Sequence, residues 1–249
     1  MNKYAAWHWD GSGPELARFG FKQVNQVNES VDLSIDAHAV RVAEFAEGLE
    51  SGEHLVINCE RYGNRNVIHA IRLAHAARAA NPGVFIGVYV PQVNGDKWGI
   101  CGRLPSPRDN MIAVQRTTEA IEQLAPWVDF WPVDMHFGES GTNTPVAFWD
   151  TTPQATQELI VTQRVAMLEP YGKPWWGVMS VSAVPDLAKP IGTIVNKDWL
   201  YAQAAWCRNK GADAVYVMVW DDARHKAEGT GRIANTPNIT QTLASIGKL

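Results

Sequence analysis

Cysteine is scarce in this sequence. Its 249 residues include 3 cysteines, Cys59, Cys101 and Cys207. A disulfide-stabilised scaffold needs a denser set, and the spacing of these three fits no zinc motif, so both classes of protein are excluded. We therefore expect a protein whose stability comes from a packed core.

Long apolar runs and an excess of basic charge are also missing. No stretch approaches the ~18 consecutive apolar residues that span a bilayer, so we expect no membrane partner. With 22 Lys+Arg against 26 Asp+Glu, the formal net charge of −4 argues against a nucleic-acid partner. The first ten residues contain one lysine and no apolar segment of a secretory signal, which predicts a protein that is cytoplasmic or released by lysis. The sequence carries no signature of oligomeric state.

Phosphate-binding loops and common nucleophile motifs are absent as well. The Gly-Glu-Ser-Gly segment at 138–141 is not followed by the Lys-Ser/Thr that a P-loop requires. Neither a nucleophile elbow nor a catalytic Cys/His pairing is visible. We expect no cofactor.

What the chain does have is a regular alternation of two periodicities. Hydrophobic residues make up 46% of it and charged residues 19%, which is typical of a globular protein with a large core. Strands, rich in β-branched and aromatic residues, are expected at 4–9, 21–27, 54–59, 84–90, 128–135, 174–181 and 214–220. Helices are expected at 64–80, from 109 up to Pro126, from 153 up to Pro170, at 198–210 and at 238–246.

Strand–helix pairs in series predict an α/β fold with parallel strands. The length fits one (β/α) barrel of TIM type, seven-stranded or irregular eight-stranded, over residues 1–249 as a single domain. An eighth strand is not evident after Asp222. The second choice is an open, doubly wound sheet.

Loop lengths indicate where a functional site should lie. Links from a helix to the next strand are short, whereas links from a strand to the next helix, at 91–108, 136–151, 182–197 and 221–237, are long. Long connections tend to be functional, and barrel enzymes place their chemistry at the carboxyl ends of the strands. We therefore expect the site at that end.

Carboxylates gather at the ends of the predicted strands. The set consists of Asp10, Glu60, Asp134 and one of Asp221 or Asp222, with Asn58 and His136 sharing a face with Glu60 and Asp134. Convergent carboxylates suit hydrolysis of glycosidic bonds, because one donates a proton to the leaving oxygen while another group activates water or stabilises the cationic centre. Crowded like charges raise the pKa of one carboxyl and keep it protonated.

Tryptophan is abundant, with 11 residues, and many lie in or just after strands. Flat indole rings match the apolar faces of sugars, so Trp9, Trp176 and Trp220 are candidate carbohydrate-binding residues. The alternative for each is packing between helices and strands, which is the commoner role of tryptophan in a barrel strand.

The segment Ile57-Asn58-Cys59-Glu60, an Asn-x-Glu strand end followed by Arg61 and Tyr62, resembles that of the family-85 endo-β-N-acetylglucosaminidases. The hyaluronidases have a related Asp-x-Glu, so Asn58 departs from their pattern, and their disulfides cannot form here. The resemblance implies that Glu60 is the acid/base and that Asn58 orients the substrate's acetamido group. It implies an assisting role for Tyr89, which ends the next predicted strand.

Three functions follow from these residues. The first is a glycoside hydrolase for a polysaccharide or glycan, with Glu60 as acid/base and Asp134 as the second carboxylate. Asp221 and Asp10 are the next candidates for the role of Asp134. The second is a non-catalytic barrel that binds glycans or serves in an assembly. The third is a metal-dependent hydrolase with ligands drawn from His8, Asp10, His136 and Asp221 or Asp222.

Overall fold

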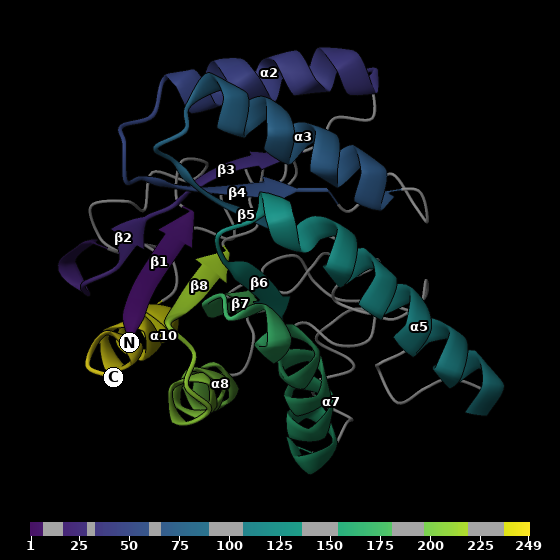
Figure 1. Ribbon diagram of the computed structural model, residues 1–249. Helices are drawn as coiled ribbons and strands as arrows, with labels where there is room; N and C mark the ends of the chain where they lie inside the picture. Colours follow the sequence, from purple (N-terminus) through teal and green to yellow (C-terminus); the bar gives the residue numbers. More distant parts are fainter. Residues whose placement is uncertain are drawn as a thin grey trace. The chain divides into compact units, whose positions relative to one another are not determined.

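The computed structural model describes residues 1–6, 17–28, 33–59, 66–89, 107–135, 154–180, 197–218 and 237–249 (Figure 1). The strands are β1 (Asn2–Ala6), β2 (Lys22–Gln23), β3 (Asn25–Asn28), β4 (His54–Asn58), β5 (Phe85–Tyr89), β6 (Trp131–Asp134), β7 (Trp175–Ser180) and β8 (Ala214–Met218). The helices are α2 (Ile35–Glu47), α3 (Asn66–Ala80), α5 (Pro107–Leu124), α7 (Gln154–Leu168), α8 (Lys197–Asn209) and α10 (Pro237–Gly247), with short 3-10 turns η2 (Ala125–Trp127) and η3 (Glu169–Tyr171).

The predicted α/β class with parallel strands is confirmed. One sheet has the order β2-β1-β8-β7-β6 and the other the order β3-β4-β5. The pairings of β1 with β2 and β8, of β7 with β8, and of β4 with β3 and β5 are all parallel. The predicted strand at 21–27 is found as two strands, β2 and β3, which pair with different neighbours on either side of Val24.

The chain divides into two compact units, which we describe one at a time. Unit 1 consists of Met1–Gln23, Asp134–Pro153 and Trp176–Leu249, and unit 2 of Val24–Val133 and Gln154–Trp175. The single domain over 1–249 stays a prediction.

In unit 2, α2 and α3 lie side by side along the three-stranded sheet (Figure 1). The side chain of Ser34 caps α2 by accepting a hydrogen bond from the backbone N–H of Ala37 at 3.2 Å. Small residues at helical spacing on α3 and β-branched or Leu residues on the strands are fully buried, namely Ala70, Leu73, Ala74, Ala77, Leu55, Ile57, Ile86 and Val88. Small side chains on a helix let it approach a sheet closely, and burial of this set forms the core of the unit.

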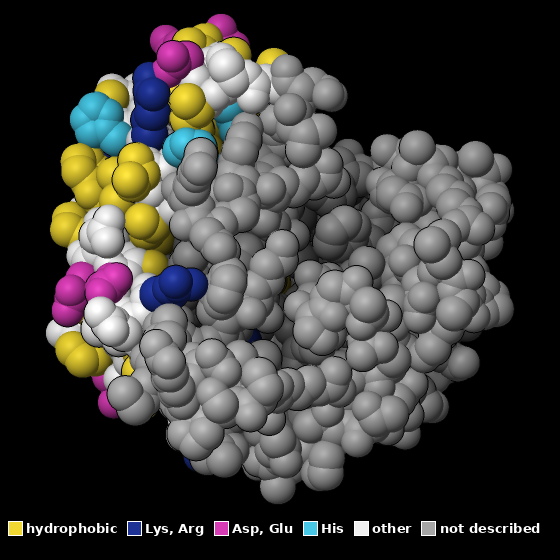
Figure 2. All heavy atoms as spheres, turned by 90° about the vertical axis from the view of Figure 1, so that its right-hand side faces the viewer, with side chains coloured by type: hydrophobic (Ala, Val, Ile, Leu, Met, Phe, Trp, Pro, Cys, Tyr) yellow, Lys and Arg dark blue, Asp and Glu magenta, His cyan; other side chains and the backbone are white. Residues whose placement is uncertain are grey.

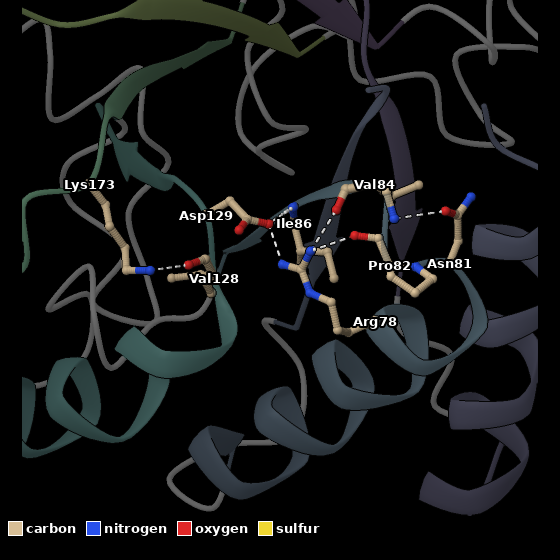
Figure 3. Close-up of polar contacts among 9 residues, drawn as sticks. Arg78, Asn81, Pro82, Val84, Ile86, Val128, Asp129 and Lys173 are labelled. Atoms are coloured by element: carbon tan, nitrogen blue, oxygen red, sulfur yellow. Dashed lines mark hydrogen bonds and ion pairs between the residues drawn. The ribbon is translucent and has the colours of Figure 1, made fainter. Parts of the chain in front are cut away.

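An ion pair closes the amino-terminal end of the same sheet (Figure 3). Arg78, in the last turn of α3, pairs with the Asp129 carboxylate and donates to the backbone oxygen of Val84 at 3.0 Å. Asp129 also accepts from the backbone N–H of Ile86 at 2.7 Å. One arginine therefore joins the end of α3, the start of β5 and the residues that lead into β6.

In unit 1, β1 and β8 run in register, with Tyr4 opposite Tyr216 (Figure 1). The helices α8 and α10 contact one another, and Lys3 donates to the backbone oxygen of Gly247 at 2.6 Å, which ties β1 to the end of α10. On β7, Gly177 leaves room for the buried Cys207: an added Cβ would meet its Sγ at 2.4 Å. Close helix–sheet contact thus explains a glycine in the middle of this strand.

The described surface mixes side-chain types, as Figure 2 shows for one face, where hydrophobic, basic, acidic and histidine side chains alternate. Scattered exposed hydrophobic residues such as Val40 and Ile68 are ordinary on a solvated surface. Among the described helices, none is long and apolar enough to cross a membrane.

Candidate functional site

A row of polar residues ends the three strands of unit 2. The last residues of β3, β4 and β5 are Asn28, Asn58 and Tyr89, and the sheet register places Asn28 opposite Asn58 and Asn58 opposite Tyr89. Residues paired in this way present their side chains on the same face of a sheet. The structure therefore brings together two of the predicted site residues, Asn58 and Tyr89, and adds Asn28.

The backbone pairing continues one residue beyond β4. The N–H of Cys59 donates to the carbonyl oxygen of Tyr89 at 2.9 Å. Cys59 is fully buried, in agreement with its interpretation as a small hydrophobic residue. The candidate acid/base, Glu60, follows directly and lies outside the described residues.

Asn58 carries an open hydrogen-bonding position. Its Oδ1 atom is buried and has no hydrogen-bond partner among the described residues. An acceptor buried without a partner costs about 1–3 kcal/mol, so such a group marks a place where a donor is expected from elsewhere. The N–H or O–H of a bound ligand is one such donor.

Gln26 and Asn28 were missed by the sequence analysis. Gln26 is 5% exposed, and its Nε2 donates to Asn28 Oδ1 at 2.6 Å. The available signal was the Gln-x-Asn pattern itself, because two amides on one face are unusual in a parallel strand covered on both sides. The predicted strand, which stopped at residue 27, left Asn28 out.

A buried histidine supports the end of β3 from the helix side. His38, in the first turns of α2, is fully buried, and burial lowers its pKa. Hydrogen bonding to the backbone of Asn28 opposes this effect, and the charge of Arg41 lowers the pKa further. The net effect favours the neutral imidazole next to the strand end.

Trp176, a predicted carbohydrate-binding residue, is placed differently. It lies near the amino-terminal end of β7, is 3% exposed, and stacks on Tyr4 with ring centroids 4.3 Å apart and planes within 6°. A ring covered in this way has no face left for a sugar. This placement corrects our expectation and favours the packing role, because Trp176 lies at the strand end away from the expected site.

The second candidate carboxylate, Asp134, ends β6, and the next residue, Met135, donates its backbone N–H to Val178 at 3.0 Å. The side chain of Asp134 is outside the described part of the chain. Six further candidates also lie outside it: Trp9, Asp10, Glu60, His136, Trp220 and Asp221.

Cysteine and metal chemistry find no site in the described residues. Cys59 and Cys207 are buried, and burial raises the pKa of Cys207 to about 12, which makes it a poor nucleophile. Within these residues no three His, Cys, Asp or Glu side chains group as metal ligands. The candidate ligands His8, Asp10, His136, Asp221 and Asp222 lie outside them.

Solved structures of glycosidases share this fold. Bee venom hyaluronidase matches with a TM-score of 0.66 at 10% identity, covering 100% of this chain and 100% of that chain. A family-128 endo-β-1,3-glucanase from Amycolatopsis mediterranei matches with a TM-score of 0.56 at 13% identity, covering 99% of this chain and 100% of that chain. A GH5-4 endoglucanase from an uncultured bacterium matches with a TM-score of 0.50 at 11% identity, covering 100% and 81%.

The sequence itself matches no protein-family model and no curated protein. At these identities the structural likeness shows only a shared fold, which in the described residues is α/β with parallel strands. The expected likeness to hyaluronidases is confirmed at the level of fold, and the finer resemblance to family 85 stays a prediction.

Proposed function

We propose that the chain is a glycoside hydrolase in which Glu60 is the acid/base and Asn58 positions the substrate. The observation that carries the proposal is the buried, unpartnered Oδ1 of Asn58 at the carboxyl end of β4, beside Tyr89 and two residues before Glu60. The fold, shared over the full chain with a hyaluronidase, supports a site at this end of the strands.

A substrate with an acetamido group fits these residues best. Its N–H supplies the donor that Asn58 Oδ1 lacks, and its carbonyl oxygen then attacks the anomeric carbon while Glu60 protonates the leaving oxygen. After the leaving group departs, Glu60 takes a proton from water as the water opens the cyclic intermediate. Asp134 is the second carboxylate of the proposal, where it stabilises the charge of that intermediate.

The remaining candidates keep their expected roles in this proposal. Asp221 and Asp10 are the next candidates after Asp134 for the second carboxylate, and Trp9, Trp220, Tyr89 and His136 are candidates for glycan contact. Trp176 is left out because it is buried against Tyr4.

We propose further that the strands form one irregular barrel with seven strand positions. Only Val24 separates β2 of one sheet from β3 of the other. At the other side of the three-stranded sheet, Gly87 of β5 bridges Phe130, the residue directly before β6. Both links join the sheets in the order that a closed barrel requires.

Hydrolysis assays with the Glu60→Gln variant test the proposal. The substrates are chitin oligosaccharides, hyaluronan and a β-1,3-glucan, with released reducing ends as the readout. We expect the parent chain to cleave an acetamido glycan and the variant to be slower by about 1000-fold at an unchanged melting temperature, because it cannot donate the proton. Glu47→Gln, at an exposed position of α2, is the matched control. Equal turnover by Glu60→Gln would contradict the assignment.

A non-catalytic glycan-binding barrel is the second candidate. It is kept because the sequence resemblance to glycosidases rests on one short strand-end motif and no family model matches the sequence. Glycan binding without hydrolysis by the parent chain, measured by calorimetry, would select this alternative.

A further inference from the structure

The carboxyl end of β3 carries two amides that the proposed reaction does not use. Gln26 and Asn28 lie two residues apart and therefore on the same face, and Gln26 Nε2 donates to Asn28 Oδ1 at 2.6 Å. Gln26 is 5% exposed and Asn28 is half-buried, so this hydrogen bond is partly shielded from water. A buried parallel strand ordinarily carries apolar residues here, and two bonded amides require a reason.

The hydrogen bond decides which half of the Asn28 amide is available. Asn28 Oδ1 accepts the hydrogen bond from Gln26 Nε2. The Nδ2 group, on the other branch of the planar amide, therefore points away from Gln26, where it can act as a donor. The side chain of Asn28 is thus held in place by Gln26.

Asn28 lies next to the open acceptor of the candidate site. The register places it opposite Asn58, whose Oδ1 is buried with no partner among the described residues. Adjacent strand ends therefore present a donor, Asn28 Nδ2, and an acceptor, Asn58 Oδ1. A sugar that carries both a hydroxyl and an acetamido group complements such a pair, since each supplies a donor and an acceptor.

We propose that Asn28 is a second saccharide-binding residue, donating through Nδ2 to an oxygen of the sugar bound at Asn58, and that Gln26 is a positioning residue acting through Asn28. This inference rests on the proposed glycan site and adds the strand β3 to it. The specificity it gives is for a glycan with an oxygen acceptor next to the group that donates to Asn58.

Calorimetric binding of the N-acetylglucosamine tetrasaccharide tests the proposal, with Glu60→Gln as the parent so that the ligand stays intact. We expect Asn28→Ala and Asn28→Asp each to weaken binding about tenfold, the usual effect of one lost hydrogen bond. Asn28→Asp keeps the shape of the side chain and replaces the donor by a negatively charged acceptor, because an ionised carboxylate accepts but does not donate; Asn28→Ala removes the donor without adding charge.

The role of Gln26 is tested in a double-mutant cycle. Gln26→Met keeps the length of the side chain and removes its donor, which frees the Asn28 amide to rotate, and we expect about threefold to tenfold weaker binding. In the Asn28→Ala background the same change should alter Kd less than about twofold. Gln26→Glu is a second variant, for the case that the methionine does not fold. Its carboxylate only accepts, so Asn28 must turn Nδ2 toward it and away from the sugar.

The control is Asn25→Ala, on the same strand, whose Nδ2 lies 3.4 Å from Glu53 Oε1 and away from the row of strand ends. It should leave Kd unchanged. Two results would overturn this inference and leave the proposed function standing. In the first, Glu60→Gln binds the glycan and Asn28→Ala does not weaken that binding. In the second, Gln26→Met weakens binding in the Asn28→Ala background as much as it does when Asn28 is present. Failure of Glu60→Gln to bind any glycan, together with failure of the unsubstituted protein to cleave one, overturns both.

Discussion

At the start of β5, the Asp129 carboxylate accepts from the backbone N–H of Ile86 and pairs with Arg78, whereas at the end of β4 the Oδ1 of Asn58 is buried without a partner among the described residues. The two places lie at opposite ends of the same three-stranded sheet, and Figure 3 shows the first of them. At the amino-terminal end of the sheet, which we call the closed end, Asp129, Arg78 and the backbone bond to one another. At the carboxyl end, which we call the open end, Asn58 Oδ1 has no partner among the described residues.

This difference in pairing suggests that the polar groups of the closed end contribute to stability and that Asn58 at the open end serves function. A paired polar group contributes to folding, and once paired it offers nothing to a ligand. An open one lowers stability and is retained where a ligand supplies the missing bond. The comparison predicts that mutations at the two ends will act on different measurements.

The largest effect is expected at the open end. Asn58→Leu should reduce glycan hydrolysis by about 100-fold, because the substrate loses a hydrogen bond that orients its reacting group. The free energy of unfolding, measured in urea, should stay the same or rise, since a buried acceptor without a partner is replaced by an apolar group. Unchanged hydrolysis by Asn58→Leu together with a lower free energy of unfolding would contradict a functional role for the open end.

Gly87 lies midway along β5, between the two ends, and its backbone packs closely against the ring of Phe130. Gly87→Ala should lower the free energy of unfolding by about 1–3 kcal/mol, because the new Cβ would lie 2.3 Å from the ring of Phe130. Gly48→Ala is the control: Gly48 ends α2 at φ −76°, and its nearest neighbour would be 3.6 Å away. Equal stability of the two variants in urea would show that the Phe130 ring can move aside.

At the closed end, Arg78→Leu should lower the free energy of unfolding by about 1–2 kcal/mol, since it removes an ion pair and two backbone hydrogen bonds at a partly exposed site. Arg72→Leu, on the same helix, breaks the more exposed pair with Asp36 and should cost less than about 0.5 kcal/mol. Chemical denaturation of both variants makes the measurement. A glycan Kd that shifts in Arg78→Leu without a change in stability would contradict the division between the two ends.

The smallest effect concerns His38, which borders the open end. Its pKa is lowered in the folded protein, so the unfolded chain binds a proton more readily. Stability is therefore present above the unfolded value near pH 6.5 and is lost as pH falls through the lower folded value, at up to about 1.4 kcal/mol per pH unit. The difference in unfolding free energy between the protein and His38→Gln, measured at pH 7.5, 6.5 and 5.5, should shrink toward acid. A constant difference would show that His38 does not titrate in this range.

Sequence periodicity was sufficient for most of the elements and for their parallel arrangement, but it missed the helix α2 at Ile35–Glu47. It also placed Asn58 and Tyr89 at the ends of successive strands, which the register confirms. It did not reveal that the strand at 21–27 is shared between two sheets, because the break at Val24 depends on which neighbours β2 and β3 find. Nor did it separate Trp176 from Trp9 and Trp220, which stay candidates for glycan binding, because burial of an aromatic ring depends on partners distant in sequence, here Tyr4.

Strand and helix periodicities and Gly and Pro signals are local, so they are enough to predict an α/β chain with polar residues at its strand ends. Which of those polar residues have partners depends on the fold. Asp129 meets Arg78 across 51 positions of the chain, while Asn58 meets Asn28 and Tyr89 only through the register of three strands. Such pairings are set by packing between distant segments, and no local pattern encodes them.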